Sequence, residues 1–140
     1  MPFAQTFTAQ PADIDELGHV NNTVWLRWVQ DIATAHWRSV AEPAFVDRFI
    51  WVVTRHEIDY RGNVGEGASV EGTTWIPDPP RGARFDRRVD FRDDTGKLLV
   101  SVRSTWAMLD RESGKLARIS ADVARPFMTP DPPAEARDTA

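Results

Sequence analysis

The residues best suited to chemistry in this chain lie within one short segment, residues 13–22. The segment carries two carboxylates, a glycine, an imidazole and two carboxamides, which are Asp13, Asp15, Gly18, His19, Asn21 and Asn22. A helix is predicted to begin at its end, and the free backbone N–H groups of a helix start favour negative charge. A carboxylate beside such amides can attack a carbonyl or activate water toward it, and the amides can hold the resulting oxyanion. The arrangement indicates acyl transfer.

A long amphipathic helix is predicted to follow this segment. Apolar residues recur there every three or four positions over about five turns. They are Val24, Trp25, Trp28, Val29, Ile32, Ala33, Trp37 and Val40. Either Asn21 or Asn22 suits the N-cap, and Pro43 ends the pattern. The tryptophans on this helix could shape a slot for an aromatic or medium-chain group, or could all belong to the core.

The remaining segments are predicted to be β-strands. A loose alternation of apolar residues favours a first strand over residues 3–10, before the helix. After the helix, strands are expected at residues 50–60, 68–76, 85–92 and 98–108, with a short extension at 116–119. Residues 93–96 fit the turn of a hairpin. These elements predict an α+β domain in which a curved antiparallel β-sheet wraps one long central α-helix.

The composition excludes several classes of function. The chain has 140 residues, which fits one domain with a sizeable core. Its net charge of −4 argues against general nucleic-acid binding. It contains no cysteine, which excludes disulfides, thiolate catalysis and cysteine-based zinc sites. The N-terminus lacks signal-peptide features, and no apolar run approaches the ~20 residues of a membrane span. We therefore expect a soluble cytoplasmic protein with neither nucleic acid nor membrane as a partner.

The chain is predicted to divide into a folded part and a tail. We expect a single domain over residues 1–125 and a disordered segment over residues 126–140, where Pro, Asp, Ala and Glu dominate. A lone sheet with one covered face leaves its edges and outer face unprotected. We therefore expect assembly into a homodimer or homotetramer.

The segment at residues 13–22, with a strand before it and Trp25 in the helix after it, resembles the hotdog-fold thioesterases. It resembles the 4-hydroxybenzoyl-CoA thioesterase-like family and is also similar to plant-type acyl-ACP thioesterases. Weaker likenesses are the strand at residues 56–60, the turn at residues 65–67 and the pair at residues 118–119. Together they cover residues 3 to about 125.

The resemblance implies a hotdog fold and the hydrolysis of acyl-CoA thioesters without a cofactor. It implies active sites at protomer interfaces, with Asp15 catalytic and the backbone amide near Asn22 donating to the oxyanion. His19 would orient the loop or polarise the thioester carbonyl. The plant-type enzymes place an asparagine two residues after the aspartate, where this chain has Leu17. This departure disfavours a mechanism that needs a carboxamide there, and the site more nearly follows the bacterial CoA-thioesterase version.

Substrate binding is assigned to residues in the loop and in the later strands. Gly18 permits a positive φ or close approach of a ligand, and Asn21 caps the helix or clamps the loop. By the resemblance, basic residues hold the nucleotide end of coenzyme A, and these are Arg81, Arg84 and Arg118. The same residues could form a solvated strand face, or could receive an acidic acyl carrier protein.

Several alternatives remain open from the sequence. Asp15 could act as nucleophile or as general base. A non-catalytic binding module for acyl-CoA or acyl carrier protein could use the same fold, and a hydratase acting on enoyl thioesters is a weaker option. A metal site at Asp13, Asp15 and His19 is disfavoured, because no second histidine or carboxylate lies nearby at helical spacing.

Overall fold

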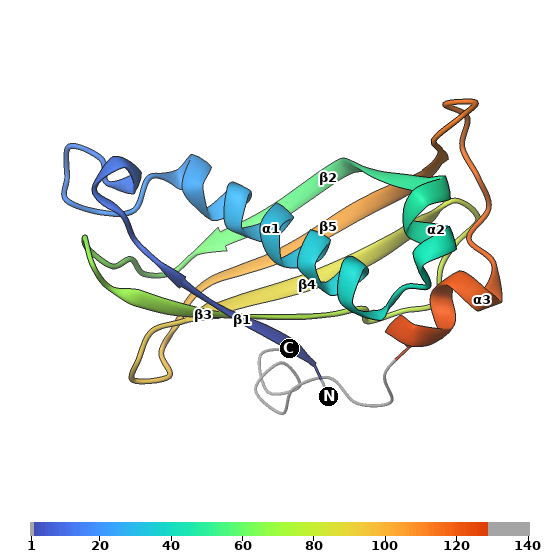
Figure 1. Cartoon of the computed structure of the whole chain (residues 1–140). Coiled ribbons are helices and arrows are strands. Elements are labelled where there is room, and N and C mark those ends of the chain that lie inside the picture. Colours follow the sequence, from blue (N-terminus) through green and yellow to red (C-terminus); the bar gives the residue numbers. More distant parts are fainter. Residues whose placement is uncertain (1, 129–140) are drawn as a thin grey trace.

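A long helix lies across one face of an antiparallel sheet in this protein, whose computed structural model describes residues 2–128. The chain forms, in order, β1 (Phe3–Thr8), η1 (Pro11–Asp13), α1 (Asn22–Val40), α2 (Pro43–Arg48), β2 (Phe49–Tyr60), β3 (Ser69–Trp75), β4 (Arg84–Arg92), β5 (Leu98–Asp110), α3 (Ala121–Ala124) and η2 (Arg125–Phe127). The five strands pair in the order β1-β3-β4-β5-β2, every pair antiparallel. The sheet curves around α1 (Figure 1), which confirms the predicted hotdog fold.

Helix α1 forms for the reasons that its sequence indicates. The Asn21 side chain caps it by accepting the backbone N–H of Thr23 at 3.0 Å. Its apolar face is buried throughout, while the positions between stay exposed. The helix ends at Val40, before Pro43. None of the helices within residues 2–128 is long and apolar enough to cross a membrane.

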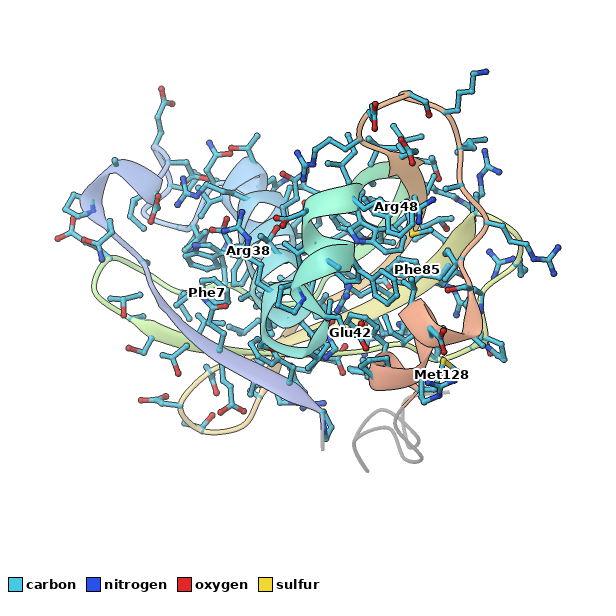
Figure 2. The ribbon with its side chains drawn as sticks, turned by 45° about the vertical axis from the view of Figure 1, so that its right-hand side comes forward. Phe7, Arg38, Glu42, Arg48, Phe85 and Met128 are labelled. Carbon is cyan, nitrogen blue, oxygen red and sulfur yellow. The ribbon has the colours of Figure 1, made fainter. Side chains whose placement is uncertain are left out.

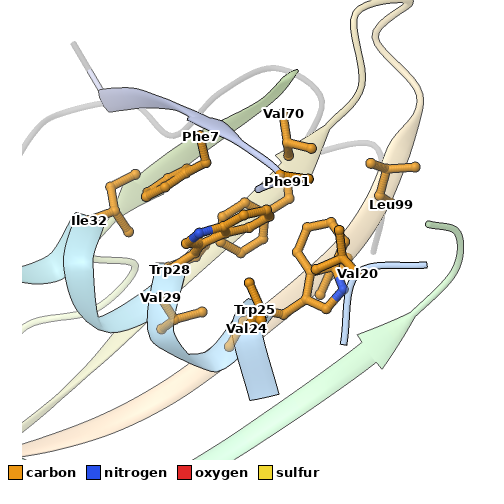
Figure 3. Close-up of a cluster of buried hydrophobic side chains, with 14 residues drawn as sticks. Phe7, Val20, Val24, Trp25, Trp28, Val29, Ile32, Val70, Phe91 and Leu99 are labelled. Atoms are coloured by element: carbon orange, nitrogen blue, oxygen red, sulfur yellow. The ribbon is translucent and has the colours of Figure 1, made fainter. Parts of the chain in front are cut away.

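The core between α1 and the sheet consists of two hydrophobic clusters. The first surrounds the start of α1 and includes Trp25, Trp28, Phe7 and Phe91, whose rings stack or meet edge-on (Figure 3). The second lies beneath the C-terminal half of α1, and its aromatic members include Trp37, Phe49, Trp51, Phe85, Trp106 and Phe127. The first cluster holds the beginning of α1 against the sheet.

The close approach of α1 to the sheet depends on a glycine in β3. A Cβ placed on Gly72 would lie 3.0 Å from Phe91, and 3.2 Å from both Ile32 and Phe7. A side chain at this position would push the helix and the sheet apart.

The structure differs from the expected organisation in the part of the chain after Pro43. The segment after Pro43 was expected to be strand throughout, but the structure contains α2 and α3; proline suits the first turn of α2, where no backbone N–H is needed. The folded part also extends past the predicted boundary at residue 125. Phe127 is buried because its ring stacks on Trp37 at 5.6 Å. Residues 129–140 of the expected tail lie outside the described residues.

The sheet has two edges, β1 and β2. Within residues 2–128, each of these strands pairs with a single neighbour, β1 with β3 and β2 with β5. β2 is the longer edge, and an irregularity between Val53 and Arg55 bends it. A long edge strand carries unpaired backbone groups that a second chain can use.

Candidate active site

The predicted catalytic segment forms a tight loop between β1 and α1. A bridge joins Ile14 to Val20 and closes the loop. Within it, the Asp15 N–H donates to the carbonyl of His19 at 2.8 Å, and the Gly18 N–H donates to the carbonyl of Asp15 at 3.0 Å. Gly18 has φ = +78°, a conformation that favours glycine. Gly18 therefore supplies the positive φ that the turn needs, which is one of the two roles predicted for it.

The Asp15 carboxylate is fixed on one side and free on the other. Its Oδ1 accepts the backbone N–H groups of Leu17 at 2.9 Å and His19 at 3.2 Å. Its Oδ2 makes no hydrogen bond with any residue from 2 to 128. The side chain is half-buried. This geometry holds one carboxylate oxygen in a set direction and leaves the other available to a ligand or water.

The start of α1 presents backbone N–H groups next to this loop. Asn21 is the N-cap, as predicted, and Asn22 is the first helical residue. The N–H of Asn22 finds no acceptor in the described part of the chain. The hydroxyl of Tyr60, at the end of β2, donates to the Asn22 carbonyl at 3.5 Å. Burial raises the pKa of Tyr60 above its ordinary value, so the phenol stays protonated near neutral pH.

An asparagine that the sequence analysis missed clamps the loop. The Asn63 side chain accepts the Val20 N–H at 3.0 Å, donates to the Val20 carbonyl at 3.1 Å and accepts the Val64 N–H at 2.8 Å. Asn63 lies beyond β2, 43 positions from Val20. The only sequence signal was an amide residue following Gly62 at the end of a predicted strand.

We predict that Asn63→Ala lowers the free energy of unfolding by about 1–3 kcal/mol. The partly buried Val20 carbonyl loses the bond that Asn63 donates, and the Val20 N–H keeps only its longer bond to the Val64 carbonyl at 3.2 Å. Asn63→Asp keeps an acceptor for the two N–H groups and loses only the bond donated to the Val20 carbonyl, so it should cost less. Urea unfolding of the three proteins checks the order. Equal stability of wild type and Asn63→Ala would show that the clamp is unimportant.

The other two polar residues of the loop, Asp13 and His19, differ in burial and in hydrogen bonding. Asp13 is buried, pairs with Arg27 at 2.8 Å and accepts the Gln10 N–H at 2.9 Å. These hydrogen bonds, that of Arg27 first, hold the pKa of Asp13 below its ordinary value. His19 is exposed, and its ring makes no hydrogen bond with the residues that the structure describes. No cluster of three or more His, Asp or Glu side chains suited to a metal ion occurs within residues 2–128.

The three predicted phosphate-binding arginines lie close to one another in the fold but far from Asp15. Arg81 forms a bridge with Arg84, the first residue of β4, and the carbonyl of the neighbouring Gly82 accepts the N–H of Ile119 at 2.9 Å, next to Arg118. This is the end of the sheet where β2 begins, whereas the Asp15 loop packs beyond the end of β2 (Figure 1). One chain therefore does not bring Asp15 and the arginines together.

The three arginines also differ in exposure and in whether they form an ion pair. Arg81 pairs with Asp86 at 3.1 Å, on the outer face of the sheet. Arg84 and Arg118 are exposed and form no ion pair with the described residues. The last two are therefore the more available for a ligand.

Sequence comparison identifies the family. The family model for the acyl-ACP thioesterase N-terminal domain matches residues 1–127. The chain belongs to this family. The predicted membership of the hotdog-fold thioesterases is thereby confirmed, and the family model that matches corresponds to the plant-type likeness.

Individual relatives of this acyl-ACP thioesterase-domain chain are distant. A chloroplastic palmitoyl-acyl carrier protein thioesterase of Gossypium hirsutum is 26% identical over 150 residues, which cover 98% of this chain and 36% of the relative. The chain spans about a third or less of the length of the curated relatives that it matches.

Solved structures show the same fold. A 1,4-dihydroxy-2-naphthoyl-CoA thioesterase from Synechocystis superposes with a TM-score of 0.78 at 15% identity, covering 95% of this chain and all (100%) of that one. The 12:0-ACP thioesterase from Umbellularia californica gives 0.77 at 20% identity, covering 91% of this chain and 51% of that one. Relatives named for either carrier, coenzyme A or acyl carrier protein, therefore share this architecture.

Proposed function

We propose that this protein is a thioesterase that hydrolyses acyl-CoA thioesters to a free acid and coenzyme A, with Asp15 as the catalytic carboxylate. The observation that carries the proposal is the geometry of Asp15: Oδ1 is held by two backbone N–H groups while Oδ2 is free, beside the start of α1. The family match supports thioester chemistry. A protein that only bound thioesters would have no need of an anionic oxygen held in this way.

The site can perform the reaction in either of two ways. As a nucleophile, Oδ2 of Asp15 attacks the thioester carbonyl, the thiolate leaves, and water then hydrolyses the resulting anhydride. As a general base, Asp15 takes a proton from water while the oxygen of that water attacks the carbonyl, and the departing thiolate receives the proton. In both, the N–H of Asn22 donates to the oxyanion. Gly18 faces open space, since a Cβ built on it would meet no described atom within 4 Å, and this leaves room for a ligand beside the loop.

We further propose that two chains pair through the free edges of β2, antiparallel, around a twofold axis. β2 runs from the end of the sheet near the arginines to the end near Asp15. Antiparallel pairing therefore sets the Asp15 loop of one chain at the same end as Arg84 and Arg118 of a second copy. Such a dimer joins the catalytic carboxylate to the phosphate-binding residues, which a single chain keeps apart.

This assembly predicts that two defective chains complement each other. Asp15→Ala removes the carboxylate, while the double change Arg84→Ala and Arg118→Ala should lower kcat/KM for acyl-CoA about tenfold or more. A refolded equimolar mixture contains mixed dimers with one intact site, so about a quarter of the wild-type sites should return. Thiol release measures this. Activity no higher than the mean of the two parent proteins would contradict the shared site.

The carrier is tested by comparing the same acyl groups on two carriers. We expect thiol release from acyl-CoA, and release from acyl carrier protein only as a slower reaction. Faster hydrolysis of the carrier-protein substrates would reassign the carrier and keep the reaction. Saturable binding of both substrates without hydrolysis would replace the enzyme with a binding module.

A further inference from the structure

A cavity of about 250 Å³ lies under the C-terminal half of α1, away from the Asp15 loop. It is bounded by α1, α2, β2, β4, β5 and α3, and Figure 2 shows Phe85 between the two short helices. Its aromatic walls are Trp37, Phe49, Trp51, Phe85, Trp106 and Phe127. It is larger than an engineered apolar cavity of about 150 Å³ that binds benzene, so it can take a small organic molecule.

One wall of this apolar cavity carries a buried arginine. Arg87 is only 3% exposed, because it points to the inner face of β4 together with Phe85 and Val89. Its Nη1 donates to Nδ1 of His36 at 3.0 Å and to the Thr74 hydroxyl at 2.9 Å. No carboxylate from residues 2–128 forms an ion pair with it.

The remaining nitrogens of this guanidinium have no partner in the described part of the chain. Nε of Arg87 is sealed from solvent and unbonded, and Nη2 makes no hydrogen bond with the residues that the structure describes. Both of the groups that Nη1 contacts are neutral. Burying a charge without a counter-charge costs free energy of folding. The unpaired guanidinium of Arg87 therefore points to a ligand that supplies the counter-charge.

The charge states are consistent with an anion site. Burial lowers the pKa of Arg87 to about 9, so the guanidinium is charged at neutral pH. Burial, and then the charge of Arg87, lower the pKa of His36 to about 3, so the imidazole is neutral and accepts through Nδ1. The charged residues among those that line the cavity, Arg38, Arg87 and Arg111, are all basic.

We propose that this cavity binds a carboxylate attached to an apolar body, with the carboxylate paired to Arg87 and the body packed among the aromatic walls. A carboxylate supplies the missing counter-charge and matches the two-nitrogen geometry of a guanidinium. The ligand has two possible sources with the same chemistry: a free monocarboxylic acid, or the distal carboxylate of a dicarboxylic thioester. Binding itself does not depend on the proposed hydrolysis.

The test is isothermal titration of the purified protein with octanoate and with 1-octanol, which share an apolar chain and differ in charge. We expect octanoate to bind once per chain and about tenfold or more tightly than 1-octanol. Equal affinities, or no binding of octanoate, would overturn the proposal. This comparison needs no variant, so it stands even where a substitution disturbs folding.

Arg87→Met and Arg88→Met provide the matched pair of variants. They remove the same charge from neighbouring positions of β4, but Arg88 lies on the opposite face of the sheet, against Trp75. We expect Arg87→Met to lose the preference for octanoate and Arg88→Met to keep it. A preference that survives in a folded Arg87→Met protein would refute the role of Arg87.

The source of the carboxylate is then decided by hydrolysis of suberoyl-CoA against octanoyl-CoA. A preference for suberoyl-CoA that disappears in Arg87→Met supports the distal carboxylate of a substrate. Equal rates, together with octanoate binding, support a free acid. Failure of hydrolysis with both thioesters would count against the proposed function alone, because the titration is independent of it.

Discussion

Asp15→Ala is expected to lower kcat/KM for acyl-CoA by about 10²–10⁴-fold, the usual contribution of a positioned acid–base or nucleophilic group. The loss should fall on kcat, because the Asp15 carboxylate acts on the reacting atoms rather than on the carrier. The fold should survive, since the loop is also closed by the Ile14–Val20 bridge and by Asn63.

Glu16→Ala is the matched control for this substitution. It removes a carboxylate from the next position of the same loop, but Glu16 is exposed and forms no ion pair with the described residues. Its kinetics should equal those of the wild type. Steady-state thiol release, with circular dichroism as the check on folding, compares the three proteins. A folded Asp15→Ala protein with unchanged kcat would remove Asp15 from the mechanism.

Trp25→Ala is expected to lower the free energy of unfolding by about 3–5 kcal/mol, the largest stability effect that we predict. Trp25 is 0% exposed, and its ring meets Trp28 and Phe91 edge-on at 5.1 and 5.3 Å. Removing it leaves a cavity where the first turn of α1 contacts the sheet. Urea unfolding followed by circular dichroism measures the loss.

Trp25→Phe separates packing from the indole group. The phenyl ring keeps much of the buried area, and the indole Nε1 has no hydrogen-bond partner in the described part of the chain, so no bond is lost. We expect this variant to lose less than half of what Trp25→Ala loses. Equal losses of stability in the two variants would show that stability does not depend on the volume of the side chain at position 25.

The same cluster connects stability to the site. Val20, in the bridge that closes the Asp15 loop, is buried in the cluster beside Trp25. A loosened helix start would therefore also displace the loop, and Trp25→Ala should lower kcat as well as stability.

Much of the fold could be predicted because its main elements follow from the local spacing of apolar residues. The spacing of the tryptophans indicated α1, and alternating apolar residues indicated the strands, whose observed bounds lie within about two residues of the expected ones. The two short helices were missed, because four to six residues carry too little periodicity to distinguish them from other structure.

The candidate site could be predicted only where its parts are adjacent in the sequence. Asp15, Gly18 and Asn22 occupy one loop and one helix start, so their proximity follows from the sequence. Asn63 reaches the loop from beyond β2, and a single sequence carries no sign of that contact. The distance of the predicted arginines from Asp15 depends on the order of the strands, which the alternation pattern alone does not give.

Arg87 shows a different limit of sequence reasoning. Strict alternation along β4 places it inward, beside Phe85 and Val89, yet a charged residue in an arginine-rich strand is more easily taken as exposed. The structure shows that the alternation was the better guide.

The most direct test of the central claim is thiol release from short, medium, long and aromatic acyl-CoAs by wild type and Asp15→Ala, side by side at equal concentration. We predict hydrolysis of at least one substrate by the wild type, and a loss of about 10²–10⁴-fold in the variant. Equal hydrolysis by both proteins would contradict catalysis by Asp15, and no hydrolysis of any acyl-CoA by folded wild type would contradict acyl-CoA hydrolysis itself.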